Sequence, residues 1–171
     1  SRHIPKYPIV HQGKNEVDVE EHRYPFAGAR NATLQLGVAG VATGAITWMN
    51  IGEDEDSYIA RVAWRPDNTL TCEWLSRDQQ TLKLIAFDAN GDRTVLVDEH
   101  LEPWVNVSND TRFLDSGEML WTSERTGYRH IYLLEPGGTV KRQLTDGDWI
   151  VTRVVTVDQK NRVAYFEGTR E

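Results

Sequence analysis

The side chains that could perform catalysis are scattered along these 171 residues, with histidines at positions 3, 11, 22, 100 and 130. The sequence contains no G-x-S-x-G nucleophile motif, no H-E-x-x-H zinc motif, no phosphate-binding loop and no G-x-G-x-x-G dinucleotide loop. We therefore expect no catalytic residue, no cofactor-binding residue and no metal ligand within this chain.

Two single residues remain as candidates for chemistry, and each has a structural explanation. His130 stands in an expected strand between Arg129 and Ile131, which favours a hydrogen-bonding role over catalysis. Cys72 shares a strand face with Leu70 and Trp74, so we expect a small core residue and not a nucleophile. Because Cys72 is the single cysteine, the chain forms no internal disulfide.

Polar clusters give equally weak signals. The run Glu53-Asp54-Glu55-Asp56 predicts an exposed loop, and it lacks the every-second-residue spacing of a calcium loop. Glycosylation sequons at Asn31, Asn106 and Asn109 matter only if the source secretes the protein into a glycosylating compartment. We expect no metal at the acidic run.

Composition limits the function classes. Hydrophobic residues make up 39% of the chain and charged residues 26%, which is typical of a folded globular protein. The net charge of −7 and the lack of a basic cluster disfavour nucleic-acid binding. No apolar run approaches the roughly 20 residues of a membrane-spanning helix, so we expect no membrane segment.

Short strands punctuated by Gly, Asp and Asn predict an all-β fold without long helices. Between Met119 and Leu144 we expect strands at 119–121, 130–134 and 140–144, with a polar connection at 122–129 and a tight turn at 136–138. A further short strand is expected at 33–38. Alternating apolar residues at 58–64 and the apolar run 82–87 predict strands buried on both faces.

The second half of the chain repeats with a period in the forties, which is typical of β-propeller blades. Four residue pairs define the period, namely Trp64 and Phe113 (49 apart), Trp74 and Trp121 (47), Leu82 and His130 (48), and Gly91 and Gly138 (47). The repeat alone also fits an antiparallel sandwich.

We therefore predict a partial β-propeller of antiparallel blades. Residues 1–23 form an irregular N-terminal arm or blade extension, and residues 24–171 form the partial propeller. Its blade units cover about 58–100 and 104–148, followed by an incomplete unit at 149–171. Closed propellers have about 4–8 blades, whereas about two complete blades are expected here. The strand edges left open predict that the isolated chain is oligomeric or domain-swapped.

Three motifs resemble segments of the dipeptidyl peptidase IV family, whose members are serine peptidases of the prolyl oligopeptidase type. They are RYPFAGARN at 23–31, SERTGYRHIY at 123–132 and LTDGDWIV at 144–151. They occur in the family's order, and with the ending YFEGT at 165–169 they span most of the chain from Arg23 onward. The chain thus resembles a fragment of the family's N-terminal propeller.

The resemblance implies a parent enzyme that releases N-terminal dipeptides with Pro or Ala in second position. Such a parent places its Ser, Asp and His in an α/β-hydrolase domain, so this chain alone is expected to be non-catalytic. Its propeller gates substrate access and supports dimerisation, which points to Ile4 to Val19 as the subunit contact. The expected partners are the hydrolase domain, peptide substrates and a second copy. The compartment is unknown, and the resemblance slightly favours a periplasmic or secreted parent.

No pocket residue is carried over from the family. Its paired glutamates lie upstream of the matched segment, so Glu20-Glu21 does not correspond to them. A Phe-Arg step that follows a Trp-Val pair in the family is missing after Trp104-Val105, where the chain continues with NVSNDT at 106–111. Arg112 and Phe113 are expected to be ordinary strand residues.

An alternative function is a stand-alone propeller-like module that binds proteins or acts as a scaffold. The parent gene discriminates between the two, because a peptidase requires a G-x-S-x-G motif some hundreds of residues downstream.

Overall fold

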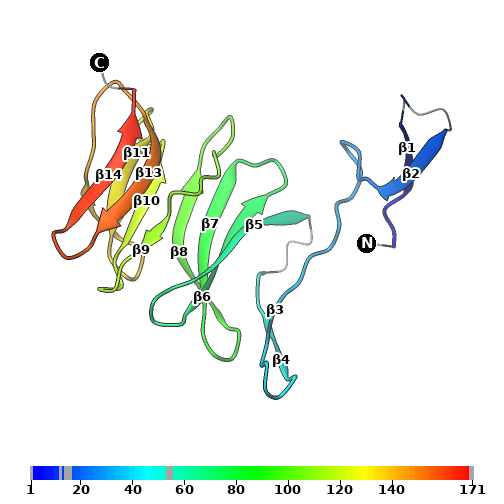
Figure 1. Ribbon diagram of the computed structural model, residues 1–171, viewed down its shortest axis with the longest axis horizontal. Helices are drawn as coiled ribbons and strands as arrows, with labels where there is room; N and C mark the ends of the chain where they lie inside the picture. The colour runs from blue at the N-terminus through cyan, green and yellow to red at the C-terminus, as the bar shows by residue number, and fades with distance from the viewer. Residues whose placement is uncertain (1, 12, 14–16, 53–55, 170–171) are drawn as a thin grey trace.

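The computed structural model describes residues 2–11, 13, 17–52 and 56–169, and within them the chain folds entirely into β-strands and connections (Figure 1). Fourteen strands of this described part form five antiparallel sheets. These residues include no helix long and apolar enough to cross a membrane.

The sheets follow one another in chain order. The first two are hairpins, β1 (Lys6–His11) with β2 (Asp18–Arg23) and β3 (Leu36–Ala39) with β4 (Ile46–Met49). The third has the order β5 (Ser57–Trp64), β6 (Leu70–Ser76), β7 (Thr81–Phe87), β8 (Arg93–His100). The fourth has the order β9 (Arg112–Phe113), β10 (Met119–Ser123), β11 (His130–Leu134), β12 (Val140–Gln143). The last is the hairpin of β13 (Val151–Asp158) and β14 (Val163–Gly168).

Three apolar cores alternate with the sheets from β3 to β14. The first joins Met49 of β4 to Cys72 and Ile85 of the third sheet. The second lies between the third and fourth sheets, and the third lies between the fourth sheet and the β13–β14 hairpin. Neighbouring sheets are therefore packed face to face, as the blades of a propeller are, and the predicted all-β partial propeller is confirmed.

The central strands show why the sheets stack. In β10, Met119 and Trp121 belong to the second core, and Leu120 between them belongs to the third. Successive side chains of a strand point to opposite faces, so a strand with apolar residues at every position requires a sheet on each side. The expected two-sided burial is confirmed for β7, where Leu82 and Leu84 belong to the second core and Ile85 and Phe87 to the first.

Strand β5 differs from that expectation. Val62 and Trp64 are 47% and 56% exposed. The physical reason is position, because β5 is an edge strand that pairs only with β6 in its sheet. The alternating pattern at 58–64 identified a strand correctly and overestimated its burial.

Strand pairing corrects part of the repeat. Leu70 pairs with Phe87 and Met119 with Leu134, and two residues further Cys72 pairs with Ile85 and Trp121 with Tyr132. The residue equivalent to Trp121 is therefore Cys72 and not Trp74. The expected strand at 33–38 also begins later, at Leu36, and β10 continues to Ser123, which shortens the polar connection.

The equivalence of Gly91 and Gly138 holds in three dimensions. Each has a positive φ, 88° and 92°, in the turn before the last strand of its sheet. A Cβ on Gly91 would lie 2.3 Å from the carbonyl oxygen of Trp48 in β4, and one on Gly138 would lie 1.7 Å from that of Leu96 in β8. Each glycine thus lets its turn approach the backbone of the preceding sheet.

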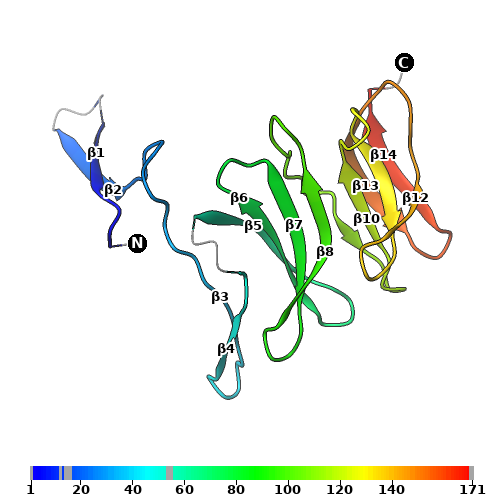
Figure 2. The ribbon, with the colours of Figure 1, turned by 180° about the vertical axis from the view of Figure 1, so that it is seen from behind.

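The β1–β2 hairpin stands apart from the stacked sheets (Figure 2). All residues of both strands are exposed. The ring of Tyr7 contacts Phe26 at a centroid distance of 5.1 Å, which connects the hairpin to the segment that follows it. The arm boundary at residue 23 and the blade limits stay predictions.

Candidate functional site

His130 joins two of the motifs that carry the family resemblance. Its buried ring places Nδ1 3.1 Å from the Thr145 hydroxyl and Nε2 3.0 Å from the Gly147 carbonyl oxygen. The ring also meets Trp149 edge to face at 5.4 Å. His130 therefore fixes the segment from Thr145 to Trp149 against β11.

The other four histidines hydrogen-bond or pair with other partners among the described residues. His3 bonds the Asn31 carbonyl oxygen, His11 and His22 contact Glu20, and His100 contacts the Thr81 hydroxyl.

Cys72, the other candidate for chemistry, is a buried thiol. Burial raises the pKa of the Cys72 thiol to about 12, which opposes thiolate chemistry at neutral pH. The described residues hold no group of three or more His, Cys, Asp or Glu placed for a metal. Glu53, Asp54 and Glu55 of the expected acidic loop lie outside the described residues.

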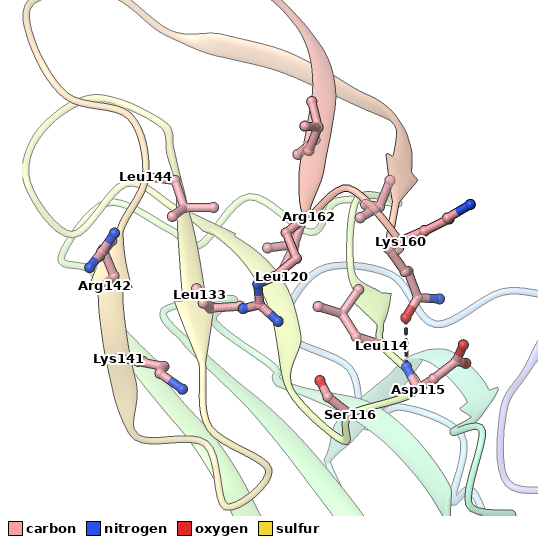
Figure 3. Close-up of a pocket in the computed structure, with 14 residues that line it drawn as sticks. Leu114, Asp115, Ser116, Leu120, Leu133, Lys141, Arg142, Leu144, Lys160 and Arg162 are labelled. Atoms are coloured by element: carbon pink, nitrogen blue, oxygen red, sulfur yellow. Dashed lines mark hydrogen bonds between the residues drawn. The ribbon is translucent and has the colours of Figure 1, made fainter.

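A cleft of about 650 Å³ lies between the fourth sheet and the β13–β14 hairpin. Figure 3 shows its apolar part, formed by Leu114, Leu120, Leu133 and Leu144, and its four basic residues, Lys141, Arg142, Lys160 and Arg162. The Ser116 hydroxyl in the cleft donates to Glu118 at 3.0 Å, so it is engaged with an acid and not with a base. The cleft thus combines an apolar floor of leucines with four basic side chains and one acidic residue, Asp115.

Glu118 neutralises part of the positive charge beside this cleft. Its buried carboxylate accepts from Lys141 Nζ at 2.8 Å and lies 3.4 Å from Arg162 Nη2. The hydrogen bond from Lys141, then that from Ser116, and the charges of both cations lower the pKa of Glu118 from 4.5 to about 2. Glu118 thus ties β10 to β12 and to the turn before β14.

Replacing Glu118 with Gln should lower the melting temperature by a few degrees at pH 7. Because the folded-state pKa lies below the unfolded one, the charged carboxylate stabilises the fold above about pH 4.5 and loses this effect toward pH 2. The difference between wild type and variant should therefore shrink by more than half from pH 7 to pH 3. Thermal melts across this range check it, and a difference independent of pH would contradict it.

The segment 104–106 is fixed by core packing and by hydrogen bonds, although the sequence predicted no role for it. Val105 is buried in the second core, and the exposed Trp104 donates from Nε1 to Asn106 Oδ1 at 3.1 Å. The Asn106 amide donates in turn to Glu124 at 2.8 Å. Asn106, Asn109 and Arg112 line a shared cleft of about 310 Å³.

A partly buried ion pair anchors this segment and was not predicted. Asp110 pairs with Arg129 and accepts the backbone N–H of Val154 at 2.9 Å. Arg129 also donates to the Thr152 carbonyl oxygen at 3.0 Å. Asp110 thereby ties the approach to β9, the approach to β11 and strand β13 together. Arg112 and Phe113 form β9, as expected of strand residues. The Arg112 side chain also donates to the Val154 carbonyl oxygen at 2.6 Å.

Comparison with known proteins gives consistent matches. The family model described as the dipeptidyl peptidase IV N-terminal region matches residues 1–171. A probable dipeptidyl peptidase 4 of Aspergillus flavus is 27% identical over 167 residues, covering 86% of this chain and 21% of the relative. The dipeptidyl peptidase 4 of Trichophyton rubrum is 25% identical over 166 residues, covering 88% and 21%.

Two solved structures share the fold. Porphyromonas gingivalis dipeptidyl peptidase 4 matches with a TM-score of 0.87 and 26% identity, over 96% of this chain and 24% of that one. A putative dipeptidyl aminopeptidase IV from Bacteroides ovatus matches with a TM-score of 0.84 and 27% identity, over 98% and 27%. The chain spans about a fifth of the length of the curated relatives it matches.

Proposed function

Because the chain belongs to the family of dipeptidyl peptidase IV N-terminal regions, we propose that it is a non-catalytic propeller segment of a serine dipeptidyl peptidase. The parent enzyme removes N-terminal dipeptides with Pro or Ala in second position. The family match over all 171 residues carries this proposal, and the likeness to two solved peptidase structures supports it.

In this proposal the chain contributes architecture, and the α/β-hydrolase domain of the parent contributes the chemistry. The stacked sheets form part of the propeller, and the propeller limits which peptides reach the hydrolase domain. The alternative of a stand-alone scaffold has less support, because the relatives are named as peptidases.

The proposal is tested with the intact protein that contains this chain. A peptide with Pro as its second residue and a matched peptide with Gly there are incubated with it, and the products are identified by mass spectrometry. Loss of the N-terminal dipeptide from the Pro peptide, at least about tenfold faster than from the Gly peptide, is expected. Removal of single residues, internal cleavage or no cleavage would contradict the proposed activity.

The β1–β2 arm is the proposed dimer contact. Val10 and Val19 are directly opposed in the hairpin and are 54% and 50% exposed. Exposed apolar side chains on neighbouring strands suit a subunit interface better than solvent. A charge at both positions should therefore oppose association without entering the stacked sheets.

The double variant Val10→Glu, Val19→Glu of the intact protein should weaken dimerisation at least about tenfold, or about 1.4 kcal/mol. Analytical ultracentrifugation over a concentration series measures this. Val41→Glu, at a fully exposed position between β3 and β4, is the matched control and should leave the dimer unchanged. An unchanged dissociation constant in the double variant would exclude the arm as the contact.

A further inference from the structure

A smaller cleft of about 170 Å³ lies between β5, β6 and the segment that leads into β9. Its volume is similar to that of an engineered cavity of about 150 Å³ that accepts benzene. The wall is apolar at Val62, Leu84 and Phe113 and polar at Arg61, Glu73, Asn109 and Thr111. This combination of size and polarity suits a small molecule with charged groups.

Glu73 is the acid of this cleft. It is 5% exposed, and its Oε1 accepts from the Thr111 hydroxyl at 3.2 Å. Its Oε2 is buried and has no hydrogen-bond partner among the described residues. Burial raises the pKa of Glu73, while the Thr111 hydrogen bond and the charge of Arg61 act in the opposite direction. A buried carboxyl oxygen without a partner is uncommon in folded proteins, which points to a missing donor.

Arg61 is the cationic residue of the same cleft, and the hydrogen bonds that it makes are directed to partners other than the free oxygen of Glu73. The two residues are directly opposed in the β5–β6 register. Arg61 nevertheless donates from Nε to Asn109 Oδ1 at 2.6 Å and from Nη1 to the Ala60 carbonyl oxygen at 2.7 Å. A guanidinium has five N–H donors, so these two bonds leave capacity for an anionic group.

We propose that this cleft binds a small zwitterion of the amino-acid class, whose ammonium group donates to Glu73 and whose carboxylate accepts from Arg61. Opposed residues of an antiparallel pair have Cβ atoms about 5 Å apart, which is within the reach of one small molecule. A simple amine would be repelled by the positive charge of Arg61, and a simple carboxylate would be repelled by the carboxylate of Glu73. Only a ligand with both charges satisfies both residues.

This inference does not depend on the proposed peptidase function, because it uses residues within the chain and a binding measurement. The 171-residue chain is titrated by calorimetry with L-alanine, ethylamine and propionate. L-alanine should bind at least about tenfold more tightly than either single-charge probe. No binding of L-alanine, or equal binding of all three, would overturn the proposal and leave solvent as the partner of Glu73.

Two variants test the proposed contacts of L-alanine with Glu73 and Arg61. Glu73→Gln and Arg61→Met should each weaken L-alanine binding at least about tenfold, and circular dichroism checks that each variant is folded. Glu102→Gln, at an exposed position outside the cleft, is the control and should bind as wild type does. Arg61 is an exposed residue of an edge strand, so Arg61→Met keeps the test decisive if Glu73→Gln fails to fold. Unchanged affinity in the folded variants would overturn the assignment.

Discussion

Replacing Gly138 with alanine should destabilise the chain by more than about 3 kcal/mol, which is a large part of the stability of an ordinary domain. Gly138 has a φ of 92°, and its added Cβ would lie 1.7 Å from the carbonyl oxygen of Leu96 and 2.4 Å from the carbonyl carbon. Both atoms belong to the backbone of β8, so no side-chain rotation relieves the overlap. The turn must move away from β8, which opens the contact between the third and fourth sheets.

Two other glycines separate the cost of a positive φ from the cost of the steric overlap with β8. Gly127 has a φ of 95° with nothing within 4 Å of its added Cβ, so Gly127→Ala should show the backbone cost alone, about 1 kcal/mol. Gly137 has neither a positive φ nor a close neighbour, and Gly137→Ala should be nearly neutral. Urea unfolding followed by circular dichroism gives the three free energies. If Gly138→Ala is no worse than Gly127→Ala, the close approach of the turn to β8 is wrong.

Trp121→Ala should cost about 3–5 kcal/mol. Trp121 is 3% exposed in the core between the third and fourth sheets, and its Nε1 donates to the buried Glu99 at 3.0 Å. The substitution leaves a cavity between two sheets and removes one donor from Glu99, although Arg125 still pairs with that carboxylate. Collapse of the cavity would require the two sheets to shift together.

Trp104→Ala is the matched control for this prediction. Trp104 is 56% exposed and makes its indole hydrogen bond to the neighbouring Asn106. Its loss should cost less than about 1 kcal/mol. Unfolding is followed by circular dichroism, because both substitutions also remove fluorescence. Equal costs at the two positions would contradict face-to-face packing of the third and fourth sheets.

The stacked β-fold was predictable because its strongest signals are local. Short β-rich runs separated by glycine turns predicted most strands, and Gly91 and Gly138 identified equivalent turns. The aromatic pair Trp74 and Trp121 gave a wrong equivalence because the β6–β7 and β10–β11 hairpins differ in length. Leu70 and its partner Phe87 are 17 positions apart, whereas Met119 and Leu134 are 15 apart. A repeat based on side-chain type alone does not detect this difference of two residues.

The polar contacts could not be predicted in the same way. Asp110 and Arg129 are 19 positions apart, and Glu73 and Thr111 are 38 apart. Arg129 belongs to the second resemblance motif, but its partner Asp110 does not, and the two meet only when the fourth sheet brings the approaches to β9 and β11 together. Glu73 and Thr111 belong to no motif and meet only where the third and fourth sheets pack. The sequence could therefore indicate the architecture and the family, while the ion pair beside β13 and the cleft at Glu73 required the structure.

The resemblance motifs have a physical basis in their mutual contacts. Arg125 lies over the ring of Tyr132 at 4.8 Å and pairs with Glu99, while His130 connects the second motif to Thr145 and Gly147 of the third. Trp149 then stacks on Phe166 of β14 at 5.9 Å. Residues of the second and third motifs thus hold the fourth sheet to the sheets on both sides.

We propose that this chain provides propeller structure and that its parent provides the peptidase chemistry. Hydrolysis of a chromogenic Gly-Pro substrate, measured side by side for the purified 171-residue chain and for the intact protein at equal molar concentration, tests it most directly. We expect release of the chromophore by the intact protein and none above background by the chain. Turnover by the chain itself, or an intact protein that leaves the substrate uncleaved, would contradict it.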